Sequence, residues 1–143
     1  VAAAFVPRAF AEAYGLDLLA GVYYTLVSPD TYRSRYKGLL RPDGSTRPVY
    51  GAFDFLRTQL VNSRYEGPVT AYAGVSGYAF EKAGGRQVQI LWSTDGQDQL
   101  TDLQSAAVAA YDKYGVPILP DDERVTVGWS PIYLEVKLSD ESE

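Results

Sequence analysis

The chain has 143 residues, of which 46% are hydrophobic, 22% charged and 13% aromatic, a composition typical of a globular protein with a buried core. Its formal charge of -5 would repel a phosphate backbone, and no basic run offsets it, so we predict no nucleic acid partner. The absence of Cys and His excludes zinc sites of the usual ligand types, thiol nucleophiles and triads with an imidazole base.

The first ten residues, VAAAFVPRAF, lack the basic flank and cleavage pattern of a signal peptide, and the chain contains no methionine. We therefore expect a processed or excised piece of a longer protein. No apolar run is long enough to span a bilayer, so no membrane partner is predicted.

The N-terminal part alternates helix and strand. Helical spacing of apolar residues predicts a helix over residues 1–14, with Pro7 in its first turn or at a kink. Residues 18–27 are apolar on both faces apart from Thr25, as in a strand buried between two layers. A polar loop with three basic residues and two tyrosines follows.

A turn and a second helix come next. Pro42-Asp43-Gly44 has the residues of a tight turn. Ser45 or Thr46 is predicted to cap a helix over residues 48–62, which starts at a proline and carries an apolar stripe. Helix, buried strand, loop and helix form the repeating unit of an α/β protein with a parallel sheet, and one unit cannot close a core alone.

From residue 65 onward the period of the pattern becomes two. Alternation is predicted first over residues 69–73 and then on both sides of a Gly84-Gly85 hairpin. Further short strands are expected within residues 106–115, 124–128 and 131–137, although the alanines of the first would equally suit a helix. About six strands in this length favour a small antiparallel sandwich or half-barrel, followed by an acidic tail at 139–143.

Five phrases, in order, carry a family resemblance: GVYYTLV, GLLRPDGSTRPVYGAFDFL, YAFEKAGGRQVQILWSTDG, AYDKYG and VTVGWSPIYLEV. Together they resemble the C-terminal end of bacterial (β/α)8-barrel glycoside hydrolases. In those enzymes the last barrel strand ends in a phrase like YTL, and a polar loop leads to GLL-x-x-DGS-x-x-P-x-Y-x-A at the start of the last helix. A small β-sandwich follows.

The resemblance implies an α+β fragment. Residues 1–64 would be the C-terminal portion of the barrel, with helix seven at 1–14, strand eight at 18–27 and helix eight at 48–62; residues 65–138 would be the sandwich. Glycosidases of this kind place an acid/base carboxylate after strand four and a nucleophilic carboxylate on strand seven. Both would lie upstream of residue 1, so no catalytic residue is predicted in this chain, and enzymatic activity is expected only of the parent protein.

What the chain would supply is one rim of the sugar cleft, at the C-terminal mouth of strand eight, where aromatic faces stack on sugars and short polar groups bind hydroxyls. The predicted substrate-binding residues are Tyr24, Thr25, Ser28, Asp30, Tyr32 and Tyr36. The implied partners are a carbohydrate substrate and the remaining barrel fragment. No cofactor or metal is predicted, and an extracellular or cell-surface location follows from the family alone.

Several aromatic and acidic residues suit a structural role as well. Tyr23 and Tyr24 fit a barrel interior as readily as a sugar platform, and only one of them can face inward. Trp92 and Trp129 are predicted as core anchors. Glu66, Glu81 and Glu135 are predicted as solvated charges, and DGQD and PDDE offer too few ligands for calcium loops.

Two other functions compete with the hydrolase fragment. A free-standing carbohydrate-binding module would need an exposed strip of aromatic residues. A structural or assembly subunit would insert its N-terminal helix and strand into a neighbouring chain.

Overall fold

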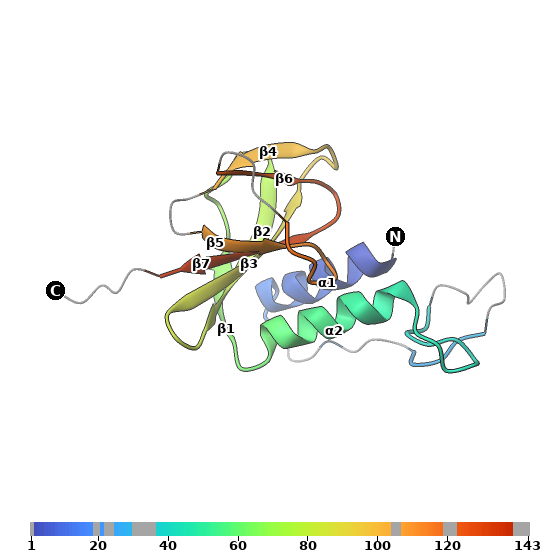
Figure 1. Ribbon diagram of the computed structural model, residues 1–143. Helices are drawn as coiled ribbons and strands as arrows, with labels where there is room; N and C mark the ends of the chain where they lie inside the picture. Colours follow the sequence, from blue (N-terminus) through green and yellow to red (C-terminus); the bar gives the residue numbers. More distant parts are fainter. Residues whose placement is uncertain are drawn as a thin grey trace.

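The computed structural model describes residues 2–18, 21, 25–29, 37–103, 107–118 and 123–138. Within them the chain forms two helices and seven strands (Figure 1). In chain order these are α1 (Ala2–Gly15), α2 (Pro48–Leu60), β1 (Arg64–Pro68), β2 (Val75–Lys82), β3 (Arg86–Ser93), β4 (Gln99–Asp102), β5 (Ala107–Tyr111), β6 (Arg124–Val127) and β7 (Ile132–Lys137).

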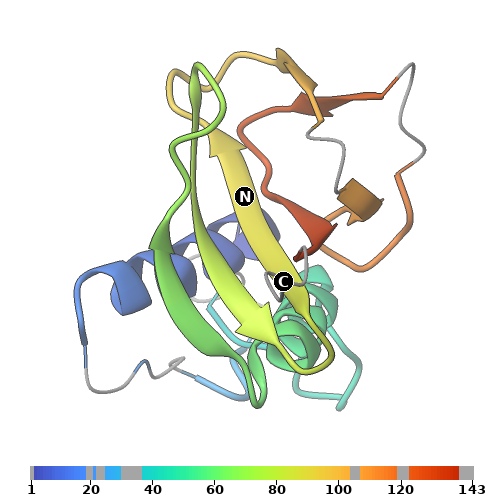
Figure 2. The same ribbon diagram turned by 90° about the vertical axis from the view of Figure 1, so that its left-hand side faces the viewer.

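The strands form two antiparallel sheets. The larger has the order β1-β2-β3-β7-β5, and β4 pairs with β6 in the smaller. In Figure 1 the helices lie below the large sheet and the small sheet lies above it, and Figure 2 shows α1 and α2 behind β1, β2 and β3. The α+β class predicted from the sequence is confirmed.

One core lies between the helices and the large sheet. Val88, Ile90 and Trp92 are alternate residues of β3, so they share one face of the sheet. They pack with Phe80 and Tyr133 of the neighbouring strands against the buried faces of the helices, which contribute Val6, Ala11, Val49 and Leu56. The two helices and the large sheet therefore share this core.

A second core lies on the opposite face of the large sheet. There Leu91 of β3 and Leu134 and Val136 of β7 meet Val125 and Val127 of β6. Two sheets face each other across this core, as the predicted sandwich requires. The difference from an ordinary sandwich is that helices, not solvent, cover the outer face of the large sheet.

Both predicted helices are confirmed, with two local corrections. Pro7 lies inside α1 and is buried, so of its two predicted places, the first turn or a kink, the first turn is wrong. The N-cap of α2 is Arg47, without a side-chain cap, so neither Ser45 nor Thr46 caps the helix. The reason is that the Ser45 hydroxyl donates to the Asp43 carboxylate at 2.6 Å within the turn, while Thr46 pairs with Leu40 in an isolated antiparallel bridge.

The buried strand predicted over residues 18–27 lies partly outside the described residues. Of the described ones, Leu18, Leu26 and Val27 are exposed, and Val27 pairs with Leu40 in an isolated parallel bridge that belongs to neither sheet. Burial was the wrong prediction for these three side chains in this chain. A parallel strand is buried when other strands flank it and helices cover both of its faces. Among the described residues only the short stretch around Leu40 pairs with this segment as a neighbouring strand would, so these side chains stay exposed.

The strand region follows the predicted pattern with one exception. Gly84 and Gly85 form the β2–β3 hairpin with φ of +81° and +67°, values that favour glycine. Residues 107–111 form β5, so the strand interpretation of the alanine-rich segment is confirmed there. Residues 69–73, predicted as a strand, instead connect β1 to β2. The acidic tail at 139–143 lies outside the described residues.

Candidate functional site

Two chain segments that flank the predicted rim loop run side by side. The amide of Leu40 donates to the carbonyl of Leu26 at 2.8 Å, and the amide of Leu39 donates to the carbonyl of Thr25 at 3.3 Å. The segment 25–28 is thereby paired with residues 38–40. These two segments, together with Arg47, are referred to below as the clasp.

Buried polar groups lock the clasp. The Gly38 amide donates to Ser28 Oγ at 2.9 Å, and Arg47 donates to the carbonyls of Ser28 at 2.9 Å and Leu40 at 3.3 Å. A Cβ at position 38 would lie 2.6 Å from the Ser28 backbone nitrogen, so glycine permits this close approach. The clasp therefore fixes the two ends of the connection formed by residues 29–37.

Of the six predicted substrate-binding residues, Tyr24, Asp30, Tyr32 and Tyr36 lie outside the described residues. Thr25 is half-buried and its carbonyl pairs with Leu39. Ser28 is buried, and its hydroxyl accepts the Gly38 amide. Thr25 and Ser28 thus both lie in the segment that pairs with residues 38–40, where Ser28 holds the backbone of Gly38.

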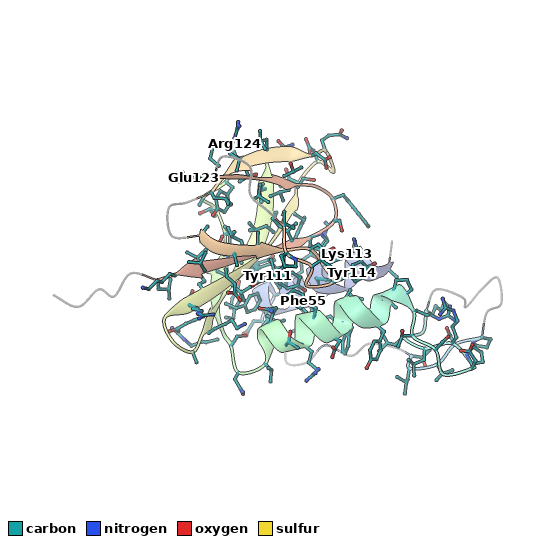
Figure 3. The ribbon with its side chains drawn as sticks, in the orientation of Figure 1. Phe55, Tyr111, Lys113, Tyr114, Glu123 and Arg124 are labelled. Carbon is teal, nitrogen blue, oxygen red and sulfur yellow. The ribbon has the colours of Figure 1, made fainter. Side chains whose placement is uncertain are left out.

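A hollow of about 520 Å³ opens beside the start of α2, next to the clasp. Arg41 and Thr46 line it, together with Tyr50 of α2 and Tyr114, both partly exposed. Tyr114 lies beside α2, where a Cβ at Gly51 would be 3.5 Å from its Cδ1, and Figure 3 shows it beside Lys113 near Phe55. Sequence reasoning missed Tyr50 and Tyr114, although both sit within the phrases that carry the family resemblance.

A second hollow, of about 490 Å³, lies beside Trp129 and is lined by Gly96, Asp98, Asp112, Lys113, Thr126, Gly128, Ser130, Pro131 and Ile132. Trp129 is 40% exposed, so its prediction as a core anchor is wrong, whereas Trp92, at 3%, is a core residue as predicted. The difference arises because Trp92 faces the helices from within β3, while Trp129 lies in the connection between β6 and β7.

The guanidinium of Arg8 lies next to both indole rings. Its Cζ is 5.0 Å from the ring centroid of Trp92 and 5.6 Å from that of Trp129. Both distances are within the range of cation–π attraction. Arg8 therefore ties the exposed indole to α1 and to the core.

Glu66, Glu81 and Glu135, predicted as solvated charges, each lie near an arginine, and Glu81 and Glu135 are partly buried. Glu81 pairs with Arg64, whose pKa this partner raises. Glu66 is 3.9 Å from the same guanidinium, and Glu135 is 3.8 Å from Arg86. Two of the three thus belong to one ion-pair network rather than to a cleft, and in the part of the chain that the structure describes no three acidic side chains gather as a metal site would need.

An apolar groove of about 280 Å³ lies between the two helices. Phe10 and Tyr14 of α1 and Phe53, Leu56 and Leu60 of α2 line it. Leu16, Leu18, Leu26 and Val27 are also exposed. Exposed apolar side chains are therefore frequent in the N-terminal third of the chain. Neither described helix is long and apolar enough to cross a membrane.

Comparison with known proteins yields a structural likeness. No protein-family model matches the chain, and no curated protein sequence matches it. Its fold is similar to part of a family 39 glycoside hydrolase from the gut symbiont Bacteroides cellulosilyticus WH2, with a TM-score of 0.72 and 22% sequence identity. The likeness covers 94% of this chain and 30% of that hydrolase. At this identity it shows a shared fold.

Proposed function

We propose that this chain is the C-terminal portion of a (β/α)8-barrel glycoside hydrolase acting on a poly- or oligosaccharide. In this assignment it contributes one rim of the sugar cleft and a β-sandwich that supports the barrel. The observation that carries the proposal is the fold likeness over 94% of the chain to 30% of a family 39 glycoside hydrolase. The five sequence phrases point to the same end of the same kind of enzyme.

The uncovered apolar residues support the proposal. Leu26 and Val27 are 59% and 47% exposed, although their sequence pattern is that of a buried strand. In a barrel, strands on both sides and helices outside would cover them, together with the groove between α1 and α2. The proposed missing partner is therefore the remainder of the barrel.

The clasp gives the proposed rim a physical basis. Residues 29–37 carry Asp30, Tyr32 and Tyr36, and the clasp holds both ends of this segment through Ser28, Gly38 and Arg47. A binding loop with fixed ends loses less conformational entropy when it engages a ligand. The catalytic carboxylates are assigned to the upstream barrel, so this chain alone is expected to be inactive.

The test compares this chain with the protein encoded by its genomic reading frame extended upstream. The proposal expects an extension of about 200 residues or more, the remainder of a barrel. It also expects hydrolysis of at least one aryl glycoside by the longer protein and of none by this chain. A reading frame without a barrel-sized extension, or a longer protein inactive on every substrate of a broad panel, would contradict it.

The rim is tested in the longer protein. Replacing Tyr32 or Tyr36 by alanine should lower kcat/KM by about tenfold if each ring stacks on a sugar. The matched control is Val116→Ala, which changes an exposed apolar residue of the sandwich and should leave kcat/KM unchanged. Equal kinetics for all three variants would remove the loop from the substrate site.

Native mass spectrometry of material from the natural source provides an independent check. A second polypeptide bound to the 15.7 kDa chain would indicate a nicked hydrolase. Only single or self-associated chains of this mass would favour an assembly role. We further propose an extracellular or cell-surface location, which fractionation of the source cells would check.

A further inference from the structure

We propose that the hollow beside Trp129 is a second saccharide-binding site, one that takes an uncharged pyranose unit and needs no part of the barrel beyond the residues of this chain. Its lining residues come from the sandwich region, and none belongs to the clasp or to the loop that the clasp holds. The inference rests on the chemistry of this hollow and so stands apart from the proposed catalytic role.

The first requirement of such a site is an aromatic face held in position. Trp129 is 40% exposed, and Arg8 anchors its ring from α1. Gly96 lies at its edge, since a Cβ there would be 3.8 Å from the indole Cδ1. An exposed but anchored indole offers apolar contact to the C–H face of a sugar at a small entropic cost.

The second requirement is an acceptor for sugar hydroxyls beside that face. The carboxylate of Asp98 packs over Gly128, where a Cβ would lie 2.5 Å from Asp98 Oδ1. Gly128 directly precedes Trp129, and Asp98 and Trp129 both line the hollow. Within the described residues Asp98 has no hydrogen-bond or ion-pair partner. Its two oxygens can therefore accept hydrogen bonds from two adjacent hydroxyls.

The third requirement is a hydrogen-bond donor in the same hollow. Lys113 Nζ donates to Ser130 Oγ at 3.0 Å and lies 4.8 Å from the ring centroid of Tyr114. An ammonium has three N–H groups, so the bond to Ser130 leaves donors for a ligand oxygen. The turn that carries Lys113 is fixed because Asp112 Oδ1 accepts the amides of Tyr114 at 2.8 Å and Val116 at 2.9 Å.

The charges in the hollow select the class of sugar. Two carboxylates, Asp98 and Asp112, and one ammonium, that of Lys113, line the hollow, while the Arg8 guanidinium lies against the Trp129 ring without lining the hollow. The excess of negative charge disfavours uronic acids and sulfated or phosphorylated sugars. A neutral hexose or pentose unit with adjacent free hydroxyls matches the aromatic face and the carboxylate together.

The experiment uses the full 143-residue chain and its own fluorescence. Trp92 and Trp129 are its two tryptophans, and Trp92 is buried, so a bound sugar should change mainly the emission of Trp129. Xylohexaose, cellohexaose, mannohexaose and an oligogalacturonide are titrated, with calorimetry in parallel. At least one neutral sugar should bind saturably, with a Kd on the order of 1 mM for one pyranose in an open hollow.

Two variants and one control locate the site. Asp98→Ala should weaken binding about tenfold or more, while Asp102→Ala, which removes an exposed carboxylate of β4 outside the hollow, should leave it unchanged. Trp129→Phe should abolish the emission change and weaken the calorimetric affinity. A circular dichroism spectrum matching the parent chain is required of each variant.

Three results would overturn the inference: no saturable binding of any sugar, binding unaffected by both Asp98→Ala and Trp129→Phe, or preference for the oligogalacturonide. Because this assay uses the chain alone, its failure leaves the hydrolysis test of the longer protein intact. Conversely, binding here combined with a longer protein that lacks activity would contradict only the proposed hydrolase role.

Discussion

The guanidinium of Arg47 donates a hydrogen bond of 2.9 Å to the carbonyl of Ser28, joining residues nineteen positions apart. Both residues are buried. A buried cation must be hydrogen-bonded to offset its desolvation, and here backbone carbonyls of the clasp supply the acceptors. The same residue is the N-cap of α2, so one side chain couples the clasp to the start of the helix.

The first prediction follows from this contact. Arg47→Met keeps most of the side-chain volume but leaves the Ser28 and Leu40 carbonyls without this donor, and should lower the free energy of unfolding by about 1.5–3 kcal/mol. Urea denaturation measures the change. Arg86→Met, at a side chain 62% exposed, is the control and should stay within about 0.5 kcal/mol. Equal stability of both variants would show that the clasp holds without Arg47.

Two glycines should respond in opposite directions to alanine. At Gly77 in β2 a Cβ would lie 2.1 Å from the Ile90 carbonyl oxygen, so the strands must shift and stability should fall by about 1–3 kcal/mol or more. At Gly51 in α2 the nearest atom is 3.5 Å away, an ordinary contact, and alanine should stabilise the helix by about 0.5–1 kcal/mol. Thermal unfolding of the two variants provides the comparison, and the same sign for both would contradict it.

Tyr133 is fully buried in the core between the helices and the sheet, with its ring centroid 4.8 Å from that of Phe55. Burial raises the pKa of its hydroxyl, which finds no hydrogen-bond partner among the described residues. Tyr133→Phe should therefore leave stability unchanged or raise it by about 1 kcal/mol. A loss above that amount in chemical denaturation would point to a partner for the hydroxyl. Tyr133→Ala should cost about 3–5 kcal/mol through the cavity it leaves.

Asp43 gives the turn before α2 a dependence on pH. Its carboxylate accepts the hydroxyl of Ser45 at 2.6 Å and the amide of Ser45 at 2.9 Å, and these bonds hold its pKa below the usual 3.8. Because the folded pKa is the lower one, the resulting stability is present above pH 3.8 and is lost as the pH falls through the folded pKa. An NMR titration should place the midpoint below 3.8 in the parent chain. In Ser45→Ala, which removes the hydroxyl donor, the midpoint should move upward.

Most of the secondary structure could be read from local signals. Helix α2 begins at Pro48 because proline suits the first helical turn, and the β2–β3 hairpin lies at the glycine pair that favours positive φ. Local rules failed where a side chain had two competing partners. Ser45 is a good N-cap residue in isolation, but Asp43 in the preceding turn takes its hydroxyl instead.

The candidate sites were less accessible to sequence reasoning. Trp92 and Trp129 were predicted to share one role, yet one is buried and the other exposed. The hollow at Trp129 joins residues of the β3–β4 connection, the turn after β5, strands β6 and β7 and the connection between them, and Arg8 of α1 contacts its indole. The spacing of residues within one segment cannot predict that these distant segments lie together. Of the predicted rim, Thr25 and Ser28 lie at the base of the loop, and the burial of Ser28 depends on Gly38, ten residues further along the chain.

The sequence by itself determined the two helices and the hairpin, because these depend on periodicity and on the φ preferences of proline and glycine, which are properties of neighbouring residues. Its five phrases also carried the resemblance to a segment of glycoside hydrolases, and that resemblance implied the α+β class. Only the tertiary structure decided that the helices cover one face of the sheet, that Arg47 closes the clasp and that Trp129 stands exposed beside Asp98. Those features depend on burial and on contacts between distant segments, which exist only once the chain has folded and its apolar faces have packed together.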